Sequence, residues 1–568
     1  MKRALLSLIL AAGLRAQILP PNSSPPGPVP TSGSSNTIDV TRAPYNAKCD
    51  SVTDDRLAFQ KAINQANANW RRTGKLWTVT MPGRTCIMGS SVNPDSLVQR
   101  NLDLLSGVTI QGIPGQSKLL QTAAGRVSRR GNFNVVINVG VFFPTFKAFT
   151  NVYYNLAANP TLGSNTITLA NAADAAHFNT GDYVAYYYRA SQSPDDVQPQ
   201  NESQLSQVNK ATGVLTLVNP VGIPFVVNGF IPAVENVSAQ GLGNYHAGIS
   251  GIIVQGQNPI FITEVFYFTA KNCQFLTDVS ASGPKVPEMN TVMNSTFDSN
   301  VWDTVNGSLL TISAELPQRG SSYNTWTNNT FGSPTSGFGS WGEGEFNAGN
   351  TFSGNHIYAN AVPGGPLCAF EPMGNNITFA GNDVRVTGNW NHVNGAIICD
   401  YEDAVVANPP SRTNNYYNGV QGVTISNNTI TNCSADGNGC ITVFGNGTHV
   451  TGNTINVLAG SSAHGVLVNG TFCVGGCAQT TQVNGNIINT AGGVGVSLAV
   501  GNADSWTING NTFNNSAGGG TGIVIQGGSP SNGGSGCQIQ NNTSGTGIGT
   551  ILSRTPTNHP ACTASNNR

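Results

Sequence analysis

Apolar side chains along this chain recur in short blocks separated by glycine, asparagine and threonine, and not in long amphipathic runs. One phrase is repeated: asparagine or another small residue, any residue, then a large apolar residue. Its apolar positions are Phe275, Phe297, Phe331, Phe352, Val384, Ile430, Ile455, Ile488 and Phe513. They are 22, 34, 21, 32, 46, 25, 33 and 25 residues apart. A recurring minimum of 21–25 residues indicates a repeat into which loops are inserted.

The repeat predicts a stack of short strands. Strands of three to five residues cannot bury a face alone, and no helical period separates them. Stacking each strand on its counterpart in the next repeat gives a parallel β-helix. Asparagine suits a repeated corner, because it tolerates left-handed backbone and its amide can hydrogen-bond along the stack. The alternative, a low-complexity Gly/Asn tract, does not explain the regular Val, Ile and Phe positions.

Residues 53–70 have a helical period and differ from the rest of the chain. Their apolar stripe consists of Ala58, Phe59, Ala62, Ile63 and Ala66. We expect this helix to cover the end of the stack. Thr53 is the expected N-cap, and Asp54 and Asp55 suit the positive end of the helix. The paired aspartates are therefore interpreted as part of a cap and not as a catalytic dyad.

A family resemblance rests on the motifs around this helix. They are Val40, Tyr45, Ala47, Asp50, Thr53-Asp54-Asp55, Ala58-Phe59, Ala62-Ile63, Val79, Met81-Pro82-Gly83, Cys86 and the sequence LSGVTIQG at 105–112. Over residues 38–112 the chain resembles the pectate-lyase superfamily, also called rhamnogalacturonase/epimerase-like. One departure is Lys48-Cys49-Asp50-Ser51, where the family has a Gly-rich turn.

The resemblance implies an all-β fold, a right-handed single-stranded parallel β-helix with an N-terminal helical cap. Members of the family include polysaccharide lyases, glycoside hydrolases, tailspike-like depolymerases and epimerases. The resemblance therefore implies one fold but leaves several reactions open. Related folds include trimers, so a homotrimer is one arrangement that the resemblance allows.

Residues 160–225 interrupt the repeat. The segments at 165–169, 183–188, 205–208 and 214–218 are interpreted as antiparallel strands. Turn signals at 180–182 and 212–213 separate these segments. We predict a small antiparallel β subdomain inserted between coils. It either borders a substrate groove or has no part in substrate binding.

The N-terminus has the features of a secretory signal peptide. Lys2 and Arg3 precede an apolar stretch at 4–14, which is too short to span a bilayer. We predict a signal peptide at 1–16, a Pro/Ser-rich linker at 17–37 and one β-helix domain at 38–568. The predicted location is extracellular, with the periplasm or cell surface as alternatives.

The 11 cysteines fit an exported protein. The plausible disulfide pairs are Cys49/Cys86, Cys368/Cys399, Cys433/Cys440, Cys473/Cys477 and Cys537/Cys562. This leaves Cys273 unpaired, although sequence does not fix connectivity. No C-x-x-C pair occurs and no histidine lies at ligand spacing beside the cysteines, so no cysteine metal site is predicted.

Charge is scarce and locally concentrated. Charged residues make up 9% of the chain and the net charge is −1, which gives no basic surface for nucleic acid. No apolar run after the N-terminus is long enough for a membrane span. The segment 343–412 holds Glu343, Glu345, Glu371, Asp383, Arg385, Asp400, Glu402, Asp403 and Arg412, together with His356 and His392.

Three strands of this segment, aligned on the Gly or Pro that opens each, end near an acid. Glu343, Glu371 and Asp400 are 28 and 29 residues apart. Because adjacent coils lie about 4.8 Å apart, we expect a row of carboxyl groups with Glu371 in the middle. Stacked like charges raise one another's pKa and destabilise the fold, which favours a functional role over a solvated ridge. The candidate catalytic residues are Glu371, Asp400, Glu343, Glu345, Glu402, Asp403 and Arg412.

Two reactions suit such a row. In glycoside hydrolysis, one carboxylic acid protonates the leaving oxygen and another activates water or attacks. In β-elimination on a uronate polymer, Ca²⁺ held by Glu371, Asp400 and Glu402 would neutralise the substrate carboxylate. The base would then be an arginine or a histidine, and arginine resists deprotonation, so hydrolysis is slightly favoured and no other cofactor is predicted.

The expected partner is a polysaccharide. The candidate substrate-binding residues are Trp341, His356, Arg385, Trp390, Tyr401 and Tyr416. A third hypothesis, from another class of protein, is an adhesin or carbohydrate-binding solenoid without catalysis. Activity on a panel of polysaccharides would separate these three functions.

Overall fold

A computed structural model describes most of the chain. The described residues are 36–89, 100–122, 135–140, 152–189, 197–222, 231–239, 243–277, 288–303, 309–313, 321–333, 340–343, 347–359, 368–371, 374–386, 396–399, 422–434, 439–443, 447–469, 480–499, 506–526, 537–555 and 563–568. The expected signal peptide and nearly all of the expected linker lie outside them. No helix in the described ranges is long and apolar enough to cross a membrane.

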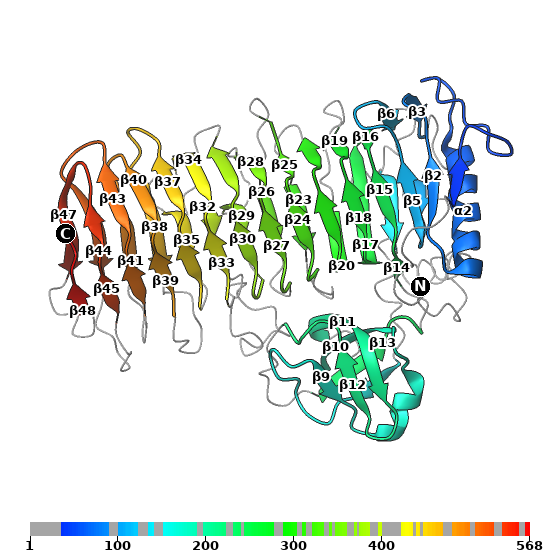
Figure 1. Cartoon of the computed structure of the whole chain (residues 1–568), viewed down its shortest axis with the longest axis horizontal. Helices are drawn as coiled ribbons and strands as arrows, with labels where there is room; N and C mark the ends of the chain where they lie inside the picture. Colours follow the sequence, from blue (N-terminus) through cyan, green and yellow to red (C-terminus); the bar gives the residue numbers. More distant parts are fainter. Residues whose placement is uncertain are drawn as a thin grey trace, which may run out of the picture.

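The predicted fold class is confirmed: the chain is a right-handed parallel β-helix. Each coil gives one strand to each of three long parallel sheets, which we name sheet A, sheet B and sheet C (Figure 1). One coil, for example, runs through β27 (Thr351–Ser353), β28 (His356–Ala359) and β29 (Cys368–Glu371) before the chain returns to sheet A at β30 (Thr378–Ala380). Strands separated by a whole coil are therefore neighbours in space.

Sheet A has 15 strands, all in parallel register. They are β1 (Thr37–Asp39), β2 (Trp77–Thr80), β5 (Val108–Gln111), β15 (Gly248–Ser250), β18 (Thr269–Lys271), β21 (Thr296–Asp298), β24 (Thr325–Thr327), β27 (Thr351–Ser353), β30 (Thr378–Ala380), β33 (Thr424–Ser426), β36 (His449–Thr451), β39 (Gln482–Asn484), β42 (Thr507–Asn509), β45 (Gln538–Gln540) and β48 (Thr563–Ser565).

Sheet B has 13 strands and adjoins sheet A through a tight corner. They are β3 (Thr85–Ile87), β6 (Ser117–Leu120), β16 (Ile252–Gly256), β19 (Gln274–Thr277), β22 (Val301–Asp303), β25 (Thr330–Phe331), β28 (His356–Ala359), β31 (Asp383–Val386), β34 (Thr429–Cys433), β37 (Thr454–Val457), β40 (Ile487–Thr490), β43 (Thr512–Asn515) and β46 (Thr543–Ser544).

Sheet C has 14 strands. They are β4 (Arg100–Leu104), β7 (Val135–Gly140), β14 (Asn244–Tyr245), β17 (Asn258–Phe266), β20 (Glu288–Met293), β23 (Leu309–Ser313), β26 (Ser340–Glu343), β29 (Cys368–Glu371), β32 (Ala396–Cys399), β35 (Gly439–Val443), β38 (His464–Asn469), β41 (Val496–Ala499), β44 (Gly520–Gln526) and β47 (Ile548–Thr555).

A ladder of asparagines, buried except for the half-buried Asn567 at its end, fixes the corner between sheets A and B. Its members are Asn300, Asn329, Asn355, Asn382, Asn428, Asn453, Asn486, Asn511, Asn542 and Asn567. Each side-chain Nδ2 donates to the Oδ1 of the next asparagine at 2.9–3.1 Å. Cys273 stands at the next position of the same corner, and its backbone N–H donates to Asn300 Oδ1. The predicted role of asparagine along the stack is therefore seen directly.

The left-handed backbone of this corner belongs to the preceding residue. That residue is Asn, Gly or Ser, with φ between 53° and 67° from Asn272 to Asn566. At 427–428, for example, exposed Asn427 has φ 54° and buried Asn428 carries the ladder bonds. The two roles expected of one asparagine are therefore divided between two neighbouring residues.

The core of the solenoid changes composition along its length. In the middle coils it is a stack of aromatic rings, in which Phe275 lies 4.0 Å from Trp302 and Phe297 lies 3.9 Å from Trp326, between ring centroids. Later coils are filled by aliphatic residues such as Ile425 and Ile455, which are fully buried. The repeated apolar positions of the sequence are thus the inward-facing residues.

Helix α2 (Arg56–Thr73) covers the N-terminal end of the stack (Figure 1). Phe59, Ala62, Ile63 and Ala66 are buried, as the apolar stripe predicted. The predicted N-cap is wrong, because Asp55 is the N-cap residue. The Thr53 hydroxyl donates instead to Asp50 Oδ2 within the preceding turn.

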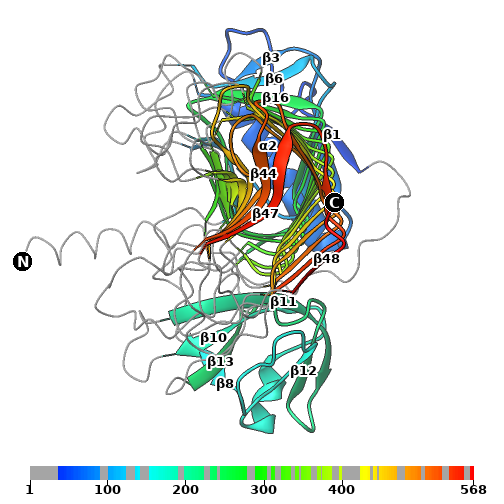
Figure 2. The same cartoon turned by 90° about the vertical axis from the view of Figure 1, so that its left-hand side faces the viewer.

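The inserted subdomain is a six-stranded antiparallel sheet in the order β8-β13-β10-β11-β12-β9. Its elements are β8 (Tyr153–Asn155), β9 (Thr166–Thr168), η4 (Ala172–His177), β10 (Tyr183–Arg189), β11 (Val197–Asn209), β12 (Val214–Leu217) and β13 (Ile231–Asn236). Two strands, β8 and β13, lie outside the predicted range 160–225. Figures 1 and 2 show the subdomain on one side of the N-terminal half of the solenoid.

An aromatic cluster joins the subdomain to the solenoid. Tyr183 of β10 packs on Phe266 of β17 with ring centroids 4.2 Å apart. The hydroxyl of Tyr323 donates to the carbonyl of Pro220 at 2.6 Å. All nine residues of β17 are buried, Glu264 among them. A strand buried on both faces is covered outside as well as inside, so the subdomain is packed onto the solenoid.

Two of the expected disulfides, Cys49–Cys86 and Cys433–Cys440, are formed. Cys537 is also disulfide-bonded, and its expected partner Cys562 lies outside the described residues. Cys473 and Cys477 lie outside them too, as do the side chains of Cys368 and Cys399. Cys273 is free and buried, as expected.

Candidate functional site

The central acidic candidates stand on sheet C. Glu343 is the last residue of β26, and Glu371 is the last residue of β29. The next strand, β32, ends at Cys399, one residue before Asp400. The strands that carry or precede these acids are neighbours in the order β26-β29-β32. The backbone therefore places Glu343 and Glu371 at the ends of neighbouring strands, near the positions that the sequence predicted.

The predicted register between these acids is wrong by one residue. Gly342, and not Glu343, stands opposite Glu371, and Glu343 is paired with Ile312 of the preceding coil. The physical reason is that the core row sets the register, because a slip of one residue would turn the buried face outward. Trp341 and Phe370 are paired in that row. An alignment of the strands on the Gly or Pro that opens each one does not give this register.

The register also bears on Trp341, a predicted sugar contact. Its partner Phe370 pairs in turn with Ile398, and both of these side chains are buried in the core. Trp341 therefore occupies a position in the core row of sheet C. The alternate row holds Thr311, Gly342, Glu371 and, beyond Cys399, Thr442.

Two predicted substrate-binding residues come together on sheet B. His356 pairs with Asp383, and Tyr358 pairs with Arg385, across β28 and β31. Arg385 donates to Asp383 Oδ2 at 2.9 Å, and His356 Nδ1 lies 3.4 Å from the same oxygen. This ion pair raises the pKa of the Arg385 guanidinium. His356 and Arg385 are more than half exposed, at 59% and 57%.

Asp383 is the residue that the site prediction missed. It belongs to the charged segment 343–412 but is not among the predicted site residues. The sequence signal is the i, i+2 spacing of Asp383 and Arg385, which places both on one face of a strand. Asp383 orients Arg385 beside His356, so this group is a polar patch on sheet B, separate from the acids of sheet C.

Most of the remaining candidates lie outside the described residues. These are Glu345, Trp390, Asp400, Tyr401, Glu402, Asp403, Arg412 and Tyr416, together with the side chains of Trp341, Glu343 and Glu371. The calcium set of Glu371, Asp400 and Glu402 falls in this group. These assignments stay predictions.

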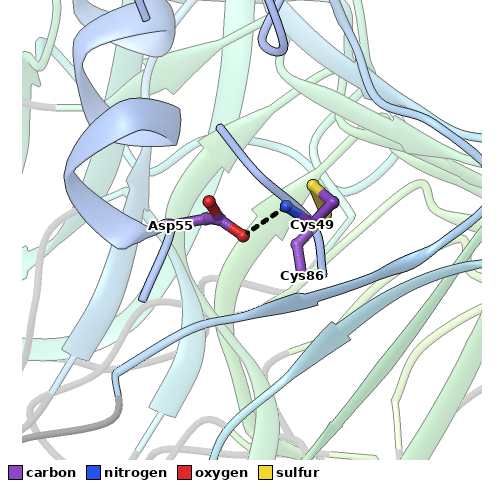
Figure 3. Close-up of side chains that lie close together, drawn as sticks. All are labelled: Cys49, Asp55 and Cys86. Carbon is purple, nitrogen blue, oxygen red and sulfur yellow. Dashed lines mark hydrogen bonds between the residues drawn. A yellow bond between two sulfur atoms is a disulfide. The ribbon is translucent and has the colours of Figure 1, made fainter. Parts of the chain in front are cut away.

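One group in the described residues has the spacing of a metal site, but it is not one. Ligand atoms of Cys49, Asp55 and Cys86 lie within 4.8 Å of one another (Figure 3). The two sulfurs form a disulfide, so neither is a thiolate that could bind a metal. Asp55 accepts the backbone N–H groups of Lys48 and Cys49 at 2.6 and 2.9 Å.

The environment of Asp55 explains its role. Burial raises the pKa of this carboxyl, and the two backbone hydrogen bonds oppose that rise. Asp54 Oδ1 accepts from the backbone N–H of Arg56 at the start of α2. Both aspartates therefore tie the N-terminal loop to the cap helix, in agreement with their interpretation as cap residues.

Known proteins similar to this chain are found among solved structures. No protein-family model matches the sequence, and no curated protein matches it. Among solved structures, the tailspike of Pseudomonas phage phi297 is similar at 11% identity and TM-score 0.46, over 92% of this chain and 79% of that one. The tailspike of Acinetobacter baumannii bacteriophage AP22, solved with a capsular saccharide, is similar at 11% identity and TM-score 0.45, over 96% and 82%.

An epimerase is similar as well. The A-module of the mannuronan C-5 epimerase AlgE4 from Azotobacter vinelandii is similar at 12% identity and TM-score 0.35, over 93% of this chain and 99% of that one. At such low identity these matches say nothing about the reaction. The fold is established by the sheets themselves, and it is the fold that the resemblance to the pectate-lyase superfamily implied.

Proposed function

We propose that this protein is a secreted glycoside hydrolase that cleaves an extracellular polysaccharide, with Glu371 as its central carboxyl group. The observation that carries the proposal is the backbone position of Glu371. It ends β29, beside Gly342 on one flanking coil and Cys399 on the other. Glu343 and Asp400 follow these two neighbours directly in the sequence.

This arrangement suits acid–base chemistry. Hydrolysis needs one carboxyl group that gives a proton to the leaving oxygen and a second that activates water or attacks the sugar. Carboxyl groups at the ends of neighbouring coils cannot all ionise freely where their side chains meet, because each charge raises the pKa of its neighbour. One group is then held protonated and another ionised, which is the division of roles that the reaction requires.

We assign the proton donor to Glu371 and the base or nucleophile to Glu343 or Asp400. Glu371 lies on the middle of the three coils, between the strands that carry or precede Glu343 and Asp400, which is why we give it the role of proton donor. The stereochemistry of the released sugar distinguishes a nucleophile from a base, since a nucleophile gives retention and a base gives inversion. Proton NMR of the first product formed reads this outcome directly.

A polysaccharide panel tests the reaction class. The purified protein would be incubated with pectin, rhamnogalacturonan, alginate and β-glucans, with and without Ca²⁺ and a chelator. New reducing ends without ultraviolet absorbance of an unsaturated uronate support hydrolysis. Calcium-dependent absorbance would replace hydrolysis by elimination. Binding without any cleavage would replace it by a carbohydrate-binding solenoid.

The assignment of Glu371 has its own test. Glu371→Gln is expected to abolish cleavage while the melting temperature stays equal or rises, because one repulsive charge is removed. The matched control is Glu288→Gln, since Glu288 occupies the same register row three coils earlier. That variant should keep full activity. Full activity in Glu371→Gln would move the site elsewhere on the molecule.

A further inference from the structure

From β24 onward, the described strands of sheet A carry no Asp, Glu, Lys or Arg, whereas the earlier strands carry Asp39, Lys271 and Asp298. In its strands the middle residue is buried and the two flanking residues lie outside, as in β27 and β30. From β24 to β48 the flanking residues are Thr325, Thr327, Thr351, Ser353, Thr378, Ala380, Thr424, Ser426, His449, Thr451, Gln482, Asn484, Thr507, Asn509, Gln538, Gln540, Thr563 and Ser565. They are hydroxyl or amide side chains, apart from one alanine and one histidine.

These residues form straight rows. Thr325, Thr351, Thr378 and Thr424 are register partners on four successive strands. A second row, two residues further along each strand, begins at Thr327 and continues through Ser353. Neighbouring rungs are about 4.8 Å apart and the two rows about 6–7 Å apart. The face is therefore a two-dimensional grid of small polar groups.

Within the described residues, none of the four threonine side chains has a hydrogen-bond partner in the protein. Some outward amides of sheet B, in contrast, do have partners in the protein. There Asn489 donates to Asn456 at 2.7 Å, and Asn514 donates to Asn489 at 2.8 Å. Other outward residues of sheet A also have partners, since Thr327 donates to Asp298 at 3.0 Å and Asn484 donates to Gln482 at 3.4 Å. The free donors and acceptors are therefore those of the threonine row.

The grid is held rigid from behind. The inward residues between the two rows, Trp326, Phe352, Phe379 and Ile425, are fully buried. The asparagine ladder runs along the adjacent corner and bonds each coil to the next. Close-packed rings and a continuous hydrogen-bond ladder keep the spacing of the rows fixed.

We infer that this face of sheet A binds ice. Ice is an uncharged lattice in which every water molecule both donates and accepts, and a threonine hydroxyl does the same. Threonine also adds a methyl group that fills space between water sites. Rows already fixed in place lose little entropy when they hold ordered water. Absence of Asp, Glu, Lys and Arg from these described strands avoids charge-ordered water shells that would disturb the lattice.

Other occupants fit this face less well. Its described outward residues include no Phe, Trp or Tyr, so it lacks the aromatic platforms on which sugar rings stack. A second protein copy would need an apolar centre, and the outward groups here are polar. The inference does not rest on the proposed hydrolase, because the grid lies on sheet A and the acids lie on sheet C.

A charged substitution in the row tests the inference on the full-length protein. The purified protein should slow the recrystallisation of fine ice, produce thermal hysteresis and enter a growing ice hemisphere. Thr424→Lys should lose all three effects. The matched control is Thr429→Lys, because Thr429 is an exposed threonine of the same coil on sheet B. It should keep them, and both variants should retain the wild-type melting temperature.

Several results would overturn the inference. Absence of all three effects in the wild-type protein would do so, and so would equal losses in both variants. Retention of the effects by Thr424→Lys would exclude this face. If Thr424→Lys instead abolished binding to a neutral polysaccharide, or abolished self-association in sedimentation, the face would belong to that partner and not to ice.

Discussion

At the scale of single residues, this solenoid depends on two neighbouring corner positions with different physical demands. One needs left-handed backbone and is exposed, and the other needs an amide and is buried. Asn427 and Asn428 show the division within one pair. The Asn428 side chain accepts from the backbone N–H and side chain of Asn382, and donates to Asn453 and to the carbonyl of Phe379. The repeated phrase in the sequence revealed that a corner existed, but not which asparagine did which task.

This division predicts that substitutions at the two adjacent positions change the free energy of unfolding by very different amounts. Asn428→Ala leaves buried donors of Asn382 and the carbonyl of Phe379 without partners, so it should lower the free energy of unfolding by about 2–4 kcal/mol. Asn427→Gly keeps the left-handed conformation and should change it by less than about 0.5 kcal/mol. Urea unfolding of both variants measures the difference. Equal effects at the two positions would show that the ladder contributes little.

At the scale of elements, apolar patterning predicted the kinds of structure well and their alignment poorly. The stripe of Phe59, Ile63 and Ala66 was enough to place the cap helix against the core. The register of β26 and β29 was not predicted correctly, because glycines that open strands mark turns and do not set the pairing. The pairing is set by buried residues of the core row, such as Phe370 and Ile398. A candidate site built from stacked strands inherits this one-residue error.

The contact between cap helix and first coils provides an element-scale prediction. Gly107 has φ 72°, and a Cβ there would fall inside the indole ring of Trp70. Gly107→Ala should therefore displace α2 and lower the free energy of unfolding by about 2–4 kcal/mol. Gly115 has φ 73° but open space around it, so Gly115→Ala should cost only the conformational term of about 1–2 kcal/mol.

Thermal unfolding followed by circular dichroism measures this pair. Because both glycines share the left-handed conformation, the difference between the variants isolates the packing of Trp70 against the first coils. Equal losses of stability in the two variants would mean that α2 shifts at no cost in free energy. Its packing would then not stabilise this end of the stack.

At the scale of the whole molecule, the sequence predicted an insertion but not how it is attached. Strands β8 and β13 lie outside the predicted range, and their pairing with each other across the subdomain identifies them as part of it. Glu264 lies in an otherwise apolar run and is buried where β17 is covered on both faces. An acid inside such a run was a signal that the strand had a second layer above it. Contacts between segments far apart in sequence are not encoded in local periodicity, so this layer could not be predicted.

The attachment of the subdomain should depend on alkaline pH. Burial raises the pKa of Tyr183, Tyr245 and Tyr323 at this interface, and the charges of neighbouring tyrosines and acids raise the first two further. A phenol with a raised folded-state pKa stabilises docking fully below the ordinary tyrosine pKa of about 10, and that stability is lost as the pH climbs toward the folded value. We expect subdomain release to begin above that ordinary pKa.

Tyr323→Phe separates the hydrogen bond from the ionisation. Losing the bond to Pro220 should weaken docking by about 1 kcal/mol at neutral pH, while removing one ionisable group should flatten the alkaline loss. The matched control is Tyr358→Phe, a half-exposed tyrosine on sheet B. Limited proteolysis across a pH series, scored by release of the subdomain, gives both quantities. Unchanged alkaline sensitivity in Tyr323→Phe would assign that sensitivity to Tyr183, to Tyr245 or to their acidic neighbours.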